Sequence, residues 1–152
     1  MEREFTLENS DDIVFTALVL WREARGEPTV GKVAVVHSIL NRVHRPKWWG
    51  KTLMEVLFKR LQYSSVTDPN DKQLVIWPVK NPLWEECKTI SYDVIYGKLA
   101  NPVPGADSYH DISIPSPYWA ESKMFVKQIG RLKFYNVDLD YEKREICEEY
   151  EK

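Results

Sequence analysis

The feature that most constrains the fold is a pair of helical stretches joined by a very short connection. Residues 11–25 contain no glycine or proline, and Gly26 and Pro28 follow directly. A glycine followed closely by a proline is typical of a helix end. Residues 29–43 form the second stretch. The pattern therefore predicts two helices separated by a tight turn.

Both stretches carry apolar residues at helical spacing. With 100° per residue, the apolar side chains of the first stretch fall in one broad sector, which predicts a core-facing helix: Ile13, Val14, Ala17, Leu18, Leu20, Trp21 and Ala24. In the second stretch the apolar stripe consists of Val33, Val36, Leu40 and Val43. His37 lies beside this stripe, and we interpret it as a hydrogen-bonded residue at the edge of the core rather than a metal ligand.

Glu23 lies near the end of the first helix, on the shoulder of its apolar sector. Arg22 falls on the opposite side, so we expect Arg22 in solvent. A carboxyl group on the shoulder is partly desolvated but still reachable from a groove. Desolvation raises its pKa, as a general acid near neutral pH requires. The plain alternative is a surface ion pair with a neighbouring arginine, which contributes little to stability.

The middle of the chain predicts an aromatic turn and a polar segment. Residues 47–50 include two neighbouring tryptophans, which would either stack on sugar faces or cover the core. Thr52 is placed to cap a short helix. We interpret residues 62–66 as an extended segment whose amide, phenol and hydroxyl groups suit a sugar groove, and residues 68–71 as a turn.

The second half predicts one long helix and a small strand region. Residues 82–96 form a helix with Cys87 in its apolar stripe, and Gly97 suits its C-terminal end. The later elements are predicted in this order: an extended segment at 107–114, a helical turn at 119–127, a half-buried strand at 131–135 and a charged tail helix at 141–150. The residues by themselves therefore predict one domain that is rich in helix.

Composition excludes several classes of protein. The 152 residues suffice for one domain with a real core, and 43% apolar and 29% charged residues are ordinary for a soluble globular protein. No run of 18 apolar residues exists, so we expect no membrane insertion. The first residues lack the apolar region of a signal peptide.

The polar and charged residues indicate neither a metal site nor a nucleic-acid site. The three histidines and two cysteines show no metal-ligand spacing, and no nucleotide-binding loop is present, so we expect no metal and no cofactor. Cys87 and Cys147 are expected as free thiols, with their pairing left open. Residues 138–152 carry a net charge of −4 and the rest +2, too weak a basic charge to indicate nucleic acid.

Several motifs resemble one known family. The sequence Glu-Ala-Arg-Gly-Glu-Pro at residues 23–28, with the segments at 31–36 and 40–43, resembles the opening of the SleB/CwlJ-type cell wall hydrolases. These are the spore cortex-lytic enzymes and their phage relatives. Later segments follow in the family's order, at residues 62–64, 106–110, 117–123 and 129–135. The resemblance covers about residues 11–136.

The resemblance implies a fold and an activity. It implies a mainly α (α+β), lysozyme-like single domain with a small strand region at residues 11–137, between a leader at 1–10 and an acidic tail at 138–152. It further implies an enzyme that cleaves the MurNAc–GlcNAc bond of peptidoglycan as a lytic transglycosylase. Glu23 would then be the catalytic acid and base, and the residues that contact substrate would be Gln62, Tyr63, Ser64, Tyr109 and His110.

Such an enzyme needs a single carboxyl group, because the C6 hydroxyl of the sugar, not water, attacks the anomeric carbon. The sequence shows no obvious second carboxylate, and a hydrolase would have to draw one from Asp68, Asp71, Asp107 and Asp111. Two departures from the family pattern are present. Tyr63 replaces a phenylalanine, and Asp107–Ser108 replaces Thr-His, which leaves His110 as a groove residue only.

Two alternatives stay open: a hydrolytic muramidase and a non-catalytic glycan-binding module. The expected partner is the glycan strand of peptidoglycan, and the expected state is a monomer without nucleic acid. The acidic tail and the missing export signal favour a phage lysin made in the host cytoplasm. It would reach the cell wall through a holin or as part of a virion.

Overall fold

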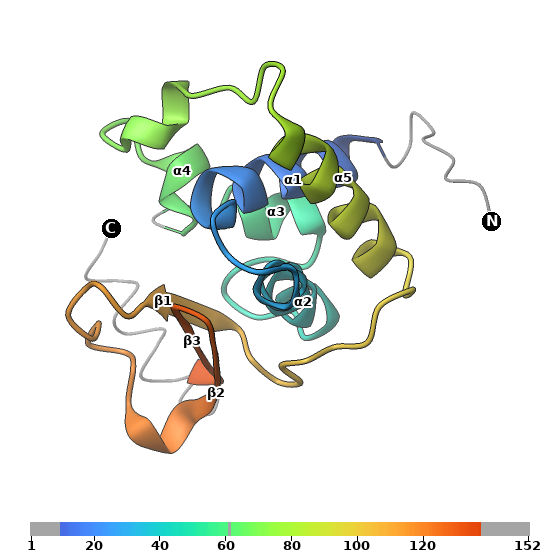
Figure 1. The fold of residues 1–152 in the computed structure, drawn as a ribbon. Coiled ribbons are helices and arrows are strands. Elements are labelled where there is room, and N and C mark those ends of the chain that lie inside the picture. The colour runs from blue at the N-terminus through green and yellow to red at the C-terminus, as the bar shows by residue number, and fades with distance from the viewer. Residues whose placement is uncertain (1–9, 61, 138–152) are drawn as a thin grey trace.

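The computed structural model describes residues 10–60 and 62–137 and is organised around one central helix. In Figure 1, α2 (Thr29–His44) is seen almost end-on, with α1 (Ser10–Ala24), α3 (Leu53–Leu57) and α5 (Pro82–Ile95) on one side and a small sheet on the other. Two shorter helical segments follow α3 along the chain, α4 (Ser64–Thr67) and the 3-10 segment η1 (Lys72–Val75). The predicted mainly α (α+β) fold with a small strand region is confirmed.

The central position of α2 explains why its burial differs from the apolar stripe predicted from the sequence. Its side chains are buried on nearly all sides, including Lys32, Ser38 and Arg42, whereas Leu40 and Val43 of the predicted stripe are only partly buried. A helix enclosed by other elements has no solvent face on which an amphipathic stripe would show. His37 is hydrogen-bonded at the edge of the core, as predicted: its Nε2 lies 2.9 Å from the carbonyl oxygen of Leu99.

The predicted exposure of Arg22 is wrong. Its side chain is buried, with Nη1 donating to the carbonyl oxygen of Ser65 at 2.9 Å and Nε to that of Ile76 at 3.1 Å. The guanidinium also lies over the ring of Trp77, 4.9 Å from its centroid. Residues 65–77 therefore cover a face of α1 that the helical wheel assigns to solvent. Val14, predicted in the core, is instead partly exposed.

The predicted cap at Thr52 is confirmed, because Thr52 accepts a hydrogen bond from the backbone N–H of Glu55 at the start of α3. Asn81, which the sequence interpretation did not name as a cap, accepts one from Leu83 at the start of α5. Gly97, with φ +72°, follows α5 in the left-handed region. Cys87 is buried in the core, and burial raises the pKa of its thiol to about 11, so it is a structural residue.

The two tryptophans of the turn at residues 47–50 cover the core. Trp49 is 2% exposed, and its indole N–H donates to the carbonyl oxygen of Arg42 at 2.9 Å. Trp48 packs against the same cluster, edge-on to Trp49. Gly50, with φ +111°, closes the turn. Of the two interpretations of this pair, the core cover is the one that the structure shows.

The polar segment at residues 62–66 is not extended as predicted. Tyr63 adopts a left-handed conformation, with φ 43°, and α4 begins at the next residue. The hydroxyl of Thr67 then donates to the carbonyl oxygen of Tyr63 at 3.2 Å. A single helical turn held by such local bonds has too few residues to show a hydrophobic period.

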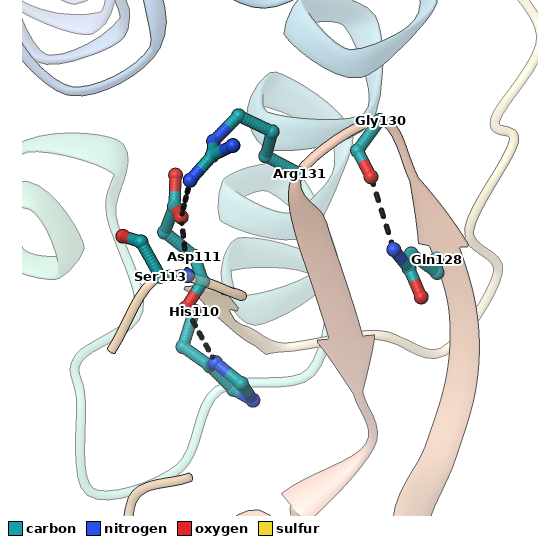
Figure 2. Close-up of polar contacts among 6 residues, drawn as sticks. All are labelled: His110, Asp111, Ser113, Gln128, Gly130 and Arg131. Carbon is teal, nitrogen blue, oxygen red and sulfur yellow. Dashed lines mark hydrogen bonds and ion pairs between the residues drawn. The ribbon is translucent and has the colours of Figure 1, made fainter. Parts of the chain in front are cut away.

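The strands form one antiparallel sheet in the order β1-β3-β2, with β1 at Ser108–Asp111, β2 at Phe125–Ile129 and β3 at Leu132–Tyr135. The predicted strand at 131–135 is confirmed. The helical turn predicted at 119–127 is wrong beyond the 3-10 segment η2 (Ser122–Met124), because β2 begins at Phe125. Figure 2 shows the tight β2–β3 turn at Gly130, where the side chain of Gln128 donates to the glycine carbonyl at 3.1 Å.

Three further observations concern membrane spans, metal-binding groups and the ends of the chain. No described helix is long and apolar enough to cross a membrane. Among residues 10–60 and 62–137, no group of three or more His, Cys, Asp or Glu side chains is gathered as a metal ion would need. The predicted leader up to residue 9, the tail helix at 141–150 and Cys147 lie outside the described residues.

We expect Gly50→Ala to destabilise the fold more than Gly97→Ala. Both glycines have positive φ, which costs an alanine on the order of 1 kcal/mol. A Cβ on Gly50 would also lie 2.7 Å from Cβ of Glu55, whereas one on Gly97 would meet nothing within 4 Å. Relief of that overlap adds about 1–3 kcal/mol. Urea unfolding of both variants measures the difference, and equal losses would contradict the close packing of this turn.

Candidate active site

Glu23 lies in the last turn of α1, half-buried, where the chain turns toward α2. The backbone N–H of Glu27 donates to the carbonyl oxygen of Ala24 at 3.0 Å and closes this turn. The carboxyl group therefore sits at the negative end of the helix dipole, which disfavours its ionised form.

Two hydroxyl groups hold the carboxyl group of Glu23 in one orientation. The Tyr109 hydroxyl of β1 donates to Oε1 at 2.7 Å, and the Ser65 hydroxyl of α4 donates to Oε2 at 2.7 Å. The two donors come from different parts of the fold, the sheet and the helical layer. Both carboxyl oxygens are thus held by hydroxyl donors.

Burial raises the pKa of Glu23 above that of an ordinary carboxyl group. The hydrogen bonds from Tyr109 and Ser65 act in the opposite direction, because they favour the ionised form, and the negative charge of Asp71 adds to the increase. Burial also raises the pKa of the Tyr109 phenol well above its usual range, so this group remains a neutral donor.

A cavity of about 470 Å³ opens next to Glu23. Its volume lies within the range of small-molecule sites. Its lining combines polar and aromatic side chains: Glu23, Arg42, Gln62, Tyr63, Ser64, Ser108, Tyr109, Ile114, Tyr118 and Trp119. The cavity therefore has one buried, protonatable group among hydrogen-bonding and apolar walls.

Arg42 is a lining residue that the sequence interpretation missed. The residue is 4% exposed. Its guanidinium donates from Nε to the carbonyl oxygen of Asp107 at 2.6 Å and from Nη1 to Oε1 of Gln62 at 3.2 Å, and it lies over the rings of Trp49 and Tyr63. Arg42 thus ties α2 to the segment at Gln62 and to the backbone just before β1. The sequence signal that could have revealed Arg42 is the tryptophan pair that follows it a few residues later, because arginine stacks readily on aromatic rings.

Comparison with known proteins agrees with this geometry. The sequence matches the cell wall hydrolase family over residues 26–135. This chain belongs to that family. The match begins after Glu23, so the place of Glu23 in the site rests on the contacts described above.

This cell wall hydrolase is similar to spore cortex-lytic enzymes of bacilli. It is 31% identical to that of Halalkalibacterium halodurans over 128 residues, which are 84% of this chain and 36% of the relative. It is 28% identical to that of Bacillus subtilis over 123 residues, 81% of this chain and 37% of the relative. The chain thus spans well under half the length of these curated relatives.

Its fold is similar to two solved catalytic domains. The catalytic domain of the germination-specific lytic transglycosylase SleB from Bacillus anthracis superposes with a TM-score of 0.67 at 27% identity, over 89% of this chain and 99% of that domain. The catalytic domain of the Bacillus cereus SleB protein gives a TM-score of 0.66 at 27% identity, over 89% and 94%. The lysozyme-like, SleB-type fold is thereby shown.

The structure brings most of the predicted site residues of this cell wall hydrolase together. Gln62, Tyr63, Ser64 and Tyr109 line the same cavity as Glu23. His110 is not among the residues that line it. Its ring is buried against Tyr135, and its Nδ1 lies 3.0 Å from the carbonyl oxygen of Asp111, as Figure 2 shows.

Of the four aspartates named as possible second carboxylates, none lines the cavity. Asp107 is buried and accepts the N–H of Val137, Asp68 accepts that of Asn70 in an exposed turn, and Asp111 pairs with Arg131 at the sheet edge. Asp71 acts on the site indirectly. It accepts a hydrogen bond from the Ser64 hydroxyl at 2.6 Å, and its negative charge raises the pKa of Glu23.

We expect Asp71→Asn to lower the pKa of Glu23. The substitution removes a negative charge that opposes ionisation of Glu23 but keeps an oxygen for the Ser64 hydroxyl. Carbon-13 NMR titration of the Glu23 carboxyl group in isotopically labelled protein measures the change. Asp68→Asn, in the same connection, removes the same charge and is the control. An unchanged Glu23 titration in Asp71→Asn would contradict the electrostatic coupling.

Proposed function

We propose that this chain cleaves the MurNAc–GlcNAc bond of peptidoglycan glycan strands as a lytic transglycosylase, with Glu23 as the single acid and base. The observation that carries this proposal is the buried carboxyl group of Glu23, fixed by two hydroxyls beside a cavity. The likeness to SleB, whose domain from Bacillus anthracis is described as a lytic transglycosylase, supports it.

In the first step the protonated carboxyl group of Glu23 donates its proton to the glycosidic oxygen. The bond between that oxygen and C1 of the muramic sugar breaks, and the leaving sugar keeps the new hydroxyl group. Positive charge then develops at C1, next to the carboxylate that has just formed. A raised pKa suits this step, because it keeps Glu23 protonated nearer to neutral pH.

In the second step the C6 hydroxyl of the same muramic sugar attacks C1, and the Glu23 carboxylate accepts its proton. A 1,6-anhydro ring closes, and Glu23 returns to its protonated form without consuming water. The hydroxyls of Tyr109 and Ser65 hold the carboxyl group in place through both steps. Their bonds are stronger to the ionised form, which stabilises the carboxylate between the steps.

A second carboxylate would be needed to activate water in a hydrolytic muramidase. Glu23 is the one carboxylate among the described residues that line the cavity. This favours the transglycosylase over the muramidase. The buried carboxyl group of Glu23, which is held by two donors and has a raised pKa, likewise favours an enzyme over a glycan-binding module. Delivery as a phage lysin and the monomeric state remain predictions of the sequence.

We expect Glu23→Gln to lose about 10²–10⁴-fold in turnover, because general acid–base transfer contributes that much and glutamine carries no exchangeable acid proton. Release of soluble fragments from purified sacculi measures it. The fold should persist. A carboxyl group with a raised native pKa contributes stability fully below its unfolded pKa of about 4.3, and that contribution is lost as pH rises through the native pKa.

Thermal unfolding at pH 8 therefore checks the structural side of this variant. At that pH the wild type loses stability by ionising a buried group, so Glu23→Gln should unfold at the same temperature or higher. The wild-type rate should also fall as pH rises through the raised pKa of Glu23. An active Glu23→Gln protein with wild-type unfolding would refute the assignment of the acid.

The reaction products distinguish the transglycosylase from the muramidase. We expect mass spectrometry of digested sacculi to show muropeptides one water lighter than hydrolysis products, with 1,6-anhydromuramic ends. Borohydride should leave these ends unchanged, because they carry no free aldehyde. Reducible muramic ends would instead establish a hydrolase, and Asp71→Asn would then be the first variant to assay.

A further inference from the structure

The cavity beside Glu23 has two chemically different walls. One wall, from the segment before and within α4, presents Gln62 and Ser64. The other, from the connection after β1, presents Ile114, Tyr118 and Trp119. We call this second group, residues 114, 118 and 119, the aromatic wall. Two of its members are widely exposed, Tyr118 at 59% and Ile114 at 50%.

Trp119, one member of the aromatic wall, packs against two other aromatic side chains. Trp119 meets His110 and Tyr135 edge-on, with centroid distances of 5.9 and 5.7 Å. His110 stacks on Tyr135 at 5.5 Å, and its Nε2 lies 3.3 Å from the tyrosine hydroxyl. Together with Met124 and Val137, Tyr135 forms a buried cluster separate from the main core. His110 therefore contacts a residue of the cavity lining, Trp119, without lining the cavity itself.

The connection itself is also restricted. Pro115 and Pro117 fix two φ angles between Ile114 and Tyr118. The backbone N–H of Ala120 donates to the carbonyl oxygen of Pro117 at 3.0 Å. A wall with few conformations loses little entropy when a ligand covers it.

We propose that the aromatic wall is a pyranose-stacking subsite, in which the ring of Tyr118 covers the apolar face of a glucosamine-type sugar. The inference rests on the proposed function and adds which surface grips the sugar. In a gluco-configured ring the substituents are equatorial, so each face presents axial C–H groups. A flat phenol ring matches such a face.

The opposite wall complements this placement. Gln62 and Ser64 line the same cavity, within which a sugar resting on Tyr118 would carry its equatorial N-acetyl and hydroxyl groups. The amide and hydroxyl of these residues offer donors and acceptors to such groups. Sugars with an axial hydroxyl would place a polar group against the ring of Tyr118 and bind less well.

The test measures binding without cleavage, in the Glu23→Gln protein, by co-sedimentation with purified peptidoglycan sacculi. We expect Tyr118→Ala in this background to weaken binding about tenfold, because a face-to-ring contact is lost. Tyr118→Phe should bind as the parent does, since it keeps the ring. Tyr96→Ala is the matched control, because Tyr96 is 45% exposed but lies after α5, outside the cavity lining.

Kinetics in the otherwise wild-type protein give a second readout. Tyr118→Ala should raise KM and leave kcat within about twofold, because the ring binds ground state and transition state alike. Unchanged sedimentation of Tyr118→Ala, or equal loss in Tyr118→Phe, would overturn the stacking subsite and leave the proposed cleavage standing. A parent that does not sediment with sacculi would overturn the subsite and the substrate together. Absence of cleavage products from the wild type would refute the proposed function alone.

Discussion

The site depends on the burial of one guanidinium group. Arg42 projects from the enclosed helix α2 and joins the segment at Gln62 to the backbone at Asp107. A buried cation is tolerated only when its donors are satisfied, and here carbonyl and amide oxygens and the faces of Trp49 and Tyr63 surround it. Because these partners come from separate parts of the chain, the packing of Arg42 holds those parts together beside the cavity.

Glu23 and Arg42 affect the stability of the fold in opposite directions. The arginine stabilises the architecture, whereas the carboxyl group costs stability whenever it ionises, because it is buried and faces the charge of Asp71. The hydroxyls of Tyr109 and Ser65 offset part of that cost. Such a balance suits a group that must both lose and regain a proton, and proteins commonly concentrate perturbed carboxyl groups at sites of chemistry.

Local signals predicted much of the fold and less of the site. Helices with clear end signals, such as the one predicted to begin at Pro82 and to end near Gly97, were correct because their signals lie within a few residues of the helix ends. The single turn of α4 and the start of β2 at Phe125 were not. Both are short, and tertiary contacts rather than propensity decide short elements.

The sequence by itself determined where Glu23 sits on its helix and that polar segments around Gln62 and Tyr109 exist, because helical spacing and motif order are local properties. Only the tertiary structure decided that Tyr109 and Ser65, 86 and 42 residues away from Glu23, meet the same carboxyl group. It likewise decided that Arg22 and Arg42 are buried and that His110 stands behind the cavity instead of in it. The physical reason is that solvent exposure depends on which elements pack on a face, and a helical wheel contains no information about them.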